Sequence, residues 1–64
     1  MDTETAKTLE AMMVYGSGFV RSLARCMGQA DPENFARLKA AFPELWRDYL
    51  KIAQGKDWIE PPRG

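Results

Sequence analysis

The stretch Gly28-Gln29-Ala30-Asp31-Pro32-Glu33 decides the fold that this sequence predicts. Glycine is frequent just past the end of a helix, where it adopts a left-handed backbone, so Gly28 is expected to end the preceding segment. An aspartate followed by proline opens a helix, because the carboxylate accepts hydrogen bonds from free backbone N–H groups and proline fits the first helical position. We therefore expect two helices joined by the short loop 28–31.

The segment before this stretch has the apolar pattern of one long helix over residues 3–27. Its apolar residues recur at spacings of three and four, and a second set one position further on widens the stripe into a core-facing surface. Arg21 and Arg25 lie toward the end of the segment, where positive charge interacts favourably with the helix dipole. The stripe consists of Leu9, Met12, Gly16, Phe19, Leu23 and Cys26.

The segment after the stretch predicts a second helix over residues 32–54, ended by Gly55. Its stripe again advances by three and four residues, and Trp46 broadens it. Pro43 removes a backbone hydrogen bond and clashes with the preceding turn, at a cost of about 3 kcal/mol inside a helix. Because the stripe keeps its phase across the proline, we expect one helix with a bend near 42–43. The stripe consists of Phe35, Leu38, Phe42, Leu45, Tyr49 and Ile52.

Together these patterns predict an all-α protein, a single helical domain over residues 1–64. The short loop favours an antiparallel helical hairpin, because it returns the second helix along the first. Residues 55–64 are expected to form a short non-helical tail, since Pro61 and Pro62 exclude further helix. Trp58 in this tail is expected to pack onto the hairpin or onto a neighbouring subunit, with binding to a partner as the alternative.

The short chain makes self-association the expected source of additional stability. A chain of 64 residues buries a smaller fraction of its surface than a larger domain does. Disulfides and metals are the usual supplements, but the sequence contains one cysteine, Cys26, and no histidine. We therefore predict a homo-oligomeric helical bundle with no metal and no cofactor. Its core and interfaces are expected to contain Leu9, Met12, Gly16, Phe19, Leu23, Phe35, Leu38, Phe42, Leu45, Trp46, Tyr49 and Trp58.

Charge and hydropathy predict a cytoplasmic protein that does not bind membranes. The nine basic and nine acidic residues give zero net charge, so no overall field attracts nucleic acid or an anionic membrane. The N-terminus Met1-Asp2-Thr3-Glu4 is acidic where a signal peptide would be basic. No apolar run approaches the roughly 18 residues that a membrane span needs. Nucleic acid ranks lowest among the possible partners.

Three stretches in the middle of the chain carry a family resemblance: Tyr15-Gly16-Ser17-Gly18-Phe19-Val20, Ala30-Asp31-Pro32-Glu33-Asn34-Phe35 and Ala41-Phe42-Pro43-Glu44-Leu45-Trp46. They resemble small uncharacterised proteins encoded by tailed bacteriophages and prophages, and Phe42-Pro43-Glu44 is the most specific part. The resemblance implies a phage accessory gene product that works in an infected or lysogenic bacterial host. That class contains many small binders that inhibit host machinery or sequester host immune signals, and the resemblance itself implies no activity.

The stretch Gly16-Ser17-Gly18 is unusual inside a predicted helix, where each glycine costs up to about 1 kcal/mol relative to alanine. The favoured interpretation is that bare backbone at Gly16 lets a neighbouring helix approach closely. The alternative is a binding site for an anion or a nucleotide messenger. In that site Arg21 and Arg25 would supply positive charge, and Tyr15 would flank the ligand.

No enzyme is expected, because the sequence offers no histidine as a general base and no nucleophile with an activating neighbour. Cys26 falls on the apolar stripe and is interpreted as a small core residue. The leading hypothesis is a phage accessory protein that acts as a homo-oligomer and inhibits host defence by binding a host protein. Sequestration of a small anionic nucleotide is the alternative. A structural or DNA-associated role ranks third, because a polar and basic recognition helix is lacking.

Overall fold

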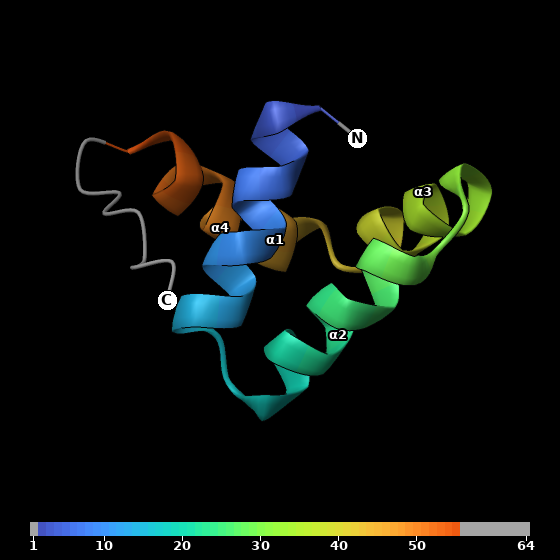
Figure 1. Ribbon diagram of the computed structural model, residues 1–64, viewed down its shortest axis with the longest axis horizontal. Coiled ribbons are helices and arrows are strands. Elements are labelled where there is room, and N and C mark those ends of the chain that lie inside the picture. Colours follow the sequence, from blue (N-terminus) through green and yellow to red (C-terminus); the bar gives the residue numbers. More distant parts are fainter. Residues whose placement is uncertain (1, 56–64) are drawn as a thin grey trace.

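The protein is all-α over residues 2–55, the part that the computed structural model describes (Figure 1). Four helices follow one another in this part of the chain: α1 (Thr3–Tyr15), α2 (Gly18–Gln29), α3 (Pro32–Ala41) and α4 (Pro43–Gln54). In Figure 1, α4 packs against one side of α1, and α2 and α3 lie toward the other side. The all-α class predicted from the sequence is therefore confirmed. None of these helices combines the length and the apolar content that a membrane span requires.

The continuous helix predicted over residues 3–27 is wrong, because the chain leaves the helical conformation at Gly16 and Ser17. Gly16 ends α1 with an extended backbone, at φ −80° and ψ 160°. Ser17 then caps α2, because its side chain accepts a hydrogen bond from the backbone N–H of Val20 at 3.4 Å. A serine at this position satisfies one of the free N–H groups of a new helix. The glycines therefore flank a helix start and do not weaken the middle of a helix.

At the junction between α2 and α3, the predicted start of α3 is confirmed, but the predicted end of α2 is not. The side chain of Asp31 accepts a hydrogen bond from the Asn34 N–H at 2.8 Å, and Pro32 is the first residue of α3. This start was predicted and is confirmed. However, α2 runs past Gly28 to Gln29, and no glycine in the described part has a positive φ. The left-handed cap predicted at Gly28 is therefore wrong.

The bend predicted at 42–43 is a break between two helices. Phe42 has a non-helical backbone, at φ −130° and ψ 60°, and Pro43 is the first residue of α4. A proline in the first turn sacrifices no helical hydrogen bond, so a restart avoids the cost of a proline inside a helix. The antiparallel pair of long helices is thus replaced by four shorter helices. Gly55 ends α4 as predicted, and its N–H donates to the Ile52 carbonyl at 3.2 Å.

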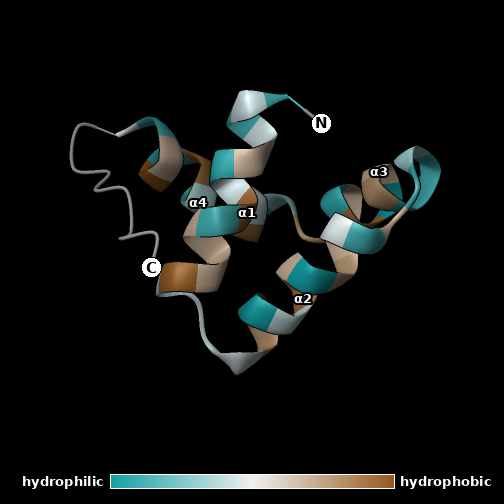
Figure 2. Cartoon of the chain, in the orientation of Figure 1, coloured by the Kyte–Doolittle hydropathy of each residue, from teal (hydrophilic) through white to brown (hydrophobic). Residues whose placement is uncertain are grey.

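A small apolar core joins α1, α2 and α4. Met12 of α1 is fully buried, and Met27 of α2 and Trp46 of α4 are nearly so. Along α2, hydrophilic and hydrophobic residues alternate in bands, as in a helix with one buried face (Figure 2). No residue of α3 is buried. The buried apolar residues of the described part are Leu9, Ala11, Met12, Val20, Leu23, Ala24, Met27, Trp46 and Ala53.

Candidate functional site

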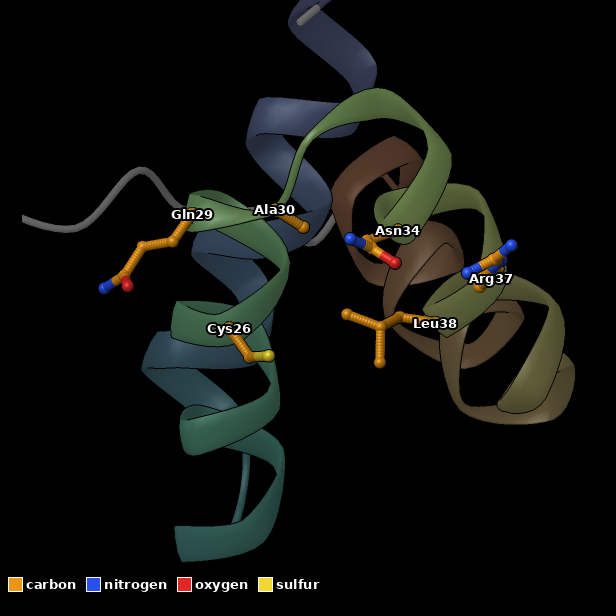
Figure 3. Close-up of a pocket in the computed structure, with 6 residues that line it drawn as sticks. All are labelled: Cys26, Gln29, Ala30, Asn34, Arg37 and Leu38. Carbon is orange, nitrogen blue, oxygen red and sulfur yellow. The ribbon is translucent and has the colours of Figure 1, made fainter.

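A hollow of about 500 Å³ lies between the C-terminal half of α2 and the facing side of α3, and we name it the α2–α3 groove. The two helices contact each other far less than α1 contacts α4. In Figure 3, the side chains of Cys26 and Leu38 point toward each other across the groove, whereas Gln29 points away from it. The lining residues are Cys26, Gln29, Ala30, Asn34, Arg37 and Leu38.

An aromatic pair, with Phe19 exposed and Phe42 partly buried, extends the apolar lining of the groove toward the start of α2. The rings of Phe19 and Phe42 meet edge to face, with centroids 5.7 Å apart and an interplanar angle of 65°. Phe19 lies seven residues before Cys26, about two turns along one side of α2, and Phe42 lies four residues after Leu38. Phe19 is nevertheless 58% exposed. The α2–α3 groove therefore has a large aromatic side chain near one end that is open to a partner.

The rim of the groove is polar but nearly neutral. Nη2 of Arg37 is 2.8 Å from Oε1 of Glu33, one turn earlier on α3, and both side chains are largely exposed. Such exposed pairs contribute about 0.3–0.5 kcal/mol on a helix, so this pair offsets charge more than it stabilises α3. Asn34 supplies a neutral amide group. This combination of an apolar floor and a rim whose arginine is paired with a glutamate suits apolar side chains better than a small anion.

The opposite side of α3 is held by contacts with Trp46 of α4. The Phe35 ring meets the indole at right angles, with centroids 5.6 Å apart. The ammonium group of Lys39, one turn further on, lies 5.1 Å from the centre of the same indole. These edge contacts position α3 without burying it, which leaves its Leu38 side available to another molecule.

The residues proposed from sequence as an anion site do not gather in one place. Arg21 and Arg25 are exposed on α2, on the side of the helix away from the core. Tyr15, at the end of α1, lines a different hollow, together with Lys51 of α4. The stretch Gly16-Ser17-Gly18 forms the turn that opens α2, so it remains next to the arginines in sequence.

The predicted core residues fall into three groups. Leu9, Met12, Leu23 and Trp46 are buried as expected. A second group packs against the core with partial exposure, namely Phe35, Leu38, Phe42, Leu45 and Tyr49. Gly16 lies beside the core at the α1–α2 turn, and Trp58 lies outside the described residues.

Two predicted core residues of α2 are exposed, which corrects the sequence interpretation. Phe19 and Cys26 were placed on a stripe that continued from α1, but both are exposed. The break at Gly16 and Ser17 resets the helical phase, so that Val20 and its neighbours one turn and two turns later take the buried side. The N-capping side chain of Ser17 was the signal in the sequence that could have revealed this restart.

Comparison with known proteins adds no relative from which a site could be transferred. No protein-family model, curated protein or solved structure matches this chain. Over residues 2–55, no three histidine, cysteine, aspartate or glutamate side chains are grouped so that they could hold a metal ion. The geometry of the α2–α3 groove therefore provides the basis for a functional proposal.

Proposed function

We propose that this protein is a non-enzymatic binding protein whose α2–α3 groove takes up apolar side chains of another protein. The observation that supports it is the poor burial of α3, which has ten residues and buries none of them. Helices of this length are marginal alone, because most helical stability in proteins comes from packing. A partner segment in the groove would cover Leu38 of α3 and Phe19 of α2, and would stabilise α3 as it bound.

The lining of the groove suggests an amphipathic segment as the partner. Apolar anchors from such a segment would contact Cys26, Ala30 and Leu38 on the floor, and polar groups beside them would meet the amide of Asn34. Aromatic side chains are enriched among the residues that dominate binding energy at interfaces. Phe19 is the exposed aromatic residue best placed for that role.

The resemblance to phage accessory proteins supports a protein of the bacterial host as this partner. Inhibition of a host defence component would then follow from occupying one of its surfaces, in the cytoplasm of an infected or lysogenic cell. The homo-oligomer predicted from chain length is part of the same proposal. Val14 of α1, which is 46% exposed, adds to the apolar surface available for self-association.

Cys26 allows the groove to be tested directly, because it is the only cysteine of the sequence, it is exposed and it lines the groove. A maleimide-linked benzophenone on Cys26 is irradiated in extract of the bacterial host, and adducts are identified by mass spectrometry. We expect one discrete adduct with a host protein. The control carries the same label on Asp48→Cys in a Cys26→Ser background, on the exposed side of α4. Equal labelling of many proteins from both positions would overturn the proposal, and an adduct of two copies of this chain would reassign the groove to self-association.

Matched substitutions test the same proposal without a label. Leu38→Ser removes an apolar side chain from the groove and Phe19→Ser removes one near its end, whereas Val14→Ser removes an exposed apolar side chain of α1 that does not line the groove. With the purified partner, we expect the two groove variants to weaken binding by about tenfold or more, as the minority of interface residues that contribute most of the binding energy do. The Val14→Ser variant should bind like the unmodified protein. Light scattering of all three reports whether self-association changes independently.

A second candidate function is sequestration of a small anionic nucleotide. The favouring observation is that Gly16-Ser17-Gly18 opens α2, which places these glycines at a helix N-terminus, where backbone N–H groups attract anions. Arg21 and Arg25 are exposed one and two turns further on. Calorimetric titration with cyclic dinucleotides tests this candidate. Binding should be lost in Arg21→Glu or Arg25→Glu without a change in the mass measured by light scattering.

A further inference from the structure

The outer side of α2, next to the α2–α3 groove, carries positive charge without matching carboxylates. Residues 11–30 contain no aspartate or glutamate, and Arg21 and Arg25 are the only charged side chains among them. Both arginines are exposed. Over residues 2–55 the only ion pair joins Arg37 to Glu33 on α3, so neither arginine of α2 is paired with a carboxylate in this part of the chain. We name Arg21 and Arg25 the basic edge of α2.

The basic edge runs beside the groove along α2. Gln29 borders the groove, and in Figure 3 its side chain points outward. Arg25 lies four residues before Gln29 and Arg21 four residues before Arg25, so successive turns place the three side chains in one row on the helix surface. With 3.6 residues per turn, Arg25 lies nearer to the groove than Arg21 does. A segment seated over Cys26 would therefore have the basic edge along one flank.

The other flank of the groove, on α3, does not offer the same charge. There Nη2 of Arg37 is 2.8 Å from Oε1 of Glu33, so this guanidinium already has a carboxylate partner. The second cation of α3, Lys39, lies 5.1 Å from the centre of the Trp46 ring on the opposite side of the helix. A further carboxylate beside Glu33 would meet like charge. The unpaired positive charge at the groove is therefore concentrated on the α2 flank.

We propose that the segment bound in the α2–α3 groove is an amphipathic helix of another protein, with acidic side chains along the flank that faces Arg21 and Arg25. This inference rests on the binding function proposed for the groove and adds the chemical class of the partner. Carboxylates three or four residues apart on such a helix match the one-turn spacing of the two arginines. A guanidinium can bind a carboxylate through two parallel hydrogen bonds. Complementary charges at the edge of an interface also speed association and exclude basic partners.

Fluorescence anisotropy with three labelled helical peptides and the full chain tests the proposal. The peptides share leucines at spacings of three and four residues, and one flank carries glutamates, glutamines or lysines. We expect the glutamate peptide to bind about five- to tenfold more tightly than the glutamine peptide, because one exposed ion pair changes Kd by up to about fivefold. The lysine peptide should bind most weakly. Between about 0.1 and 1 M salt the Debye length falls from about 10 to about 3 Å, so the three affinities should converge.

Charge reversal on the protein locates the effect. Arg25→Glu should abolish the preference for the glutamate peptide and favour the lysine peptide, and Arg21→Glu should do so less, because it lies further from the groove. Arg47→Glu makes the same change at an exposed position of α4 outside the groove lining and should do neither. Leu38→Ser should weaken all three peptides by a similar factor, because it removes an apolar contact and no charge. Far-UV circular dichroism confirms that each variant stays helical.

The outcomes separate this inference from the function on which it rests. Equal binding of the glutamate and glutamine peptides at low salt, with both weakened by Leu38→Ser, would refute the acidic partner and leave the groove as a binding site. Binding of none of the peptides would refute both. A glutamate preference unchanged by reversal of both Arg21 and Arg25 would refute the role of the basic edge. Displacement of the glutamate peptide by phosphatidylserine vesicles or by a short DNA duplex would instead assign this edge to a membrane or a nucleic acid.

Discussion

Gly16 lies so close to Val20 across the α1–α2 turn that a Cβ placed on the glycine would be 2.7 Å from the Cβ of the valine. The same Cβ would also overlap the carbonyl oxygen of Met12, one turn back on α1. The φ of Gly16 is −80°, which any residue can adopt. Close packing between two consecutive helices, and not backbone conformation, therefore requires glycine here.

Gly16→Ala should destabilise the protein. Because Val20 is buried and one of the overlapping atoms belongs to the backbone, neither neighbour can move away freely. Overpacking of this kind typically costs about 1–3 kcal/mol, a large fraction of the stability of a small domain. Urea unfolding followed by circular dichroism measures the loss.

The neighbouring glycine provides a control with the opposite expectation. A Cβ on Gly18 would meet no heavy atom within 4 Å, and Gly18 is the first residue of α2. Gly18→Ala should leave stability unchanged or raise it by up to about 1 kcal/mol, because alanine restricts the unfolded chain more than glycine does. Equal losses at the two positions would contradict the packing explanation.

The helical content of this chain was predictable because its signals are local. Spacings of three and four residues, the Asp31-Pro32 start and the Gly55 end all act within one or two turns of the chain, and each agrees with the structure. The breaks at Gly16–Ser17 and at Phe42 were not predicted, because at both places the apolar spacing favours a continuous helix while a neighbouring residue favours a helix start. At Gly16 the apolar stripe ran on past Ser17, although serine is a common cap, and at Pro43 the stripe kept its phase because only Phe42 leaves the helical conformation.

The α2–α3 groove was not predictable from the sequence, because it depends on how two helices diverge after a short turn. Leu38 and Cys26 are both predicted on core-facing stripes, and nothing in their spacing indicates that they line one hollow. The restart at Ser17 also changes which side of α2 is buried. The prediction of one continuous helix over residues 3–27 therefore places Phe19 and Cys26 in the core, although both are exposed.

The two N-caps of α2 and α3 should differ in strength. The Asp31 carboxylate is 2.8 Å from the Asn34 nitrogen, whereas the Ser17 hydroxyl is 3.4 Å from the Val20 nitrogen. Asp31→Ala should therefore cost about 1 kcal/mol, within the usual range for a lost cap, and Ser17→Ala should cost less. Urea midpoints measure both, and Asp31→Asn should retain most of the stability because asparagine also caps. A larger loss for Ser17→Ala would contradict this ranking.

Acid should weaken the start of α1 through Asp2. Its carboxylate accepts a hydrogen bond from the Thr5 N–H at 2.7 Å. Hydrogen bonding from the Thr5 side chain, and then from its backbone, lowers the pKa of Asp2 below the ordinary value of 3.8. The unfolded chain therefore takes up this proton first as the pH falls. The stabilisation is complete above the ordinary pKa and disappears as the pH falls through the folded one.

Asp2→Asn separates this effect from the titration of other carboxylates. Asparagine caps a helix without titrating in this range, so the variant should lose less stability than the unmodified protein as the pH falls below about 4. Thermal unfolding at a series of pH values measures the difference in slope. Parallel curves for the two proteins would show that Asp2 does not contribute to the acid sensitivity.

Hydrogen exchange should show α3 to be the least protected of the four described helices. Its backbone begins well, with the Asp31 cap and a Phe35 N–H that donates to the Asp31 carbonyl at 2.8 Å, yet none of its residues is buried. Exchange rates report the free energy of local opening, which is low where few apolar contacts resist it. The amides of α3 should therefore exchange faster than those in the middle of α1, where Ala11 and Met12 are fully buried.

Occupation of the α2–α3 groove should reverse this weakness, because a ligand that binds only the folded α3 reduces the population of its open form by a factor of one plus the ratio of free ligand concentration to Kd. A partner present at about 100 times its Kd would slow exchange in α3 by about 100-fold at every amide whose local opening requires the partner to dissociate. Exchange in α1 should change less, since its opening does not disrupt the groove. Protection of α3 that already equals that of α1 in the free protein would contradict the view that α3 awaits a partner to pack against.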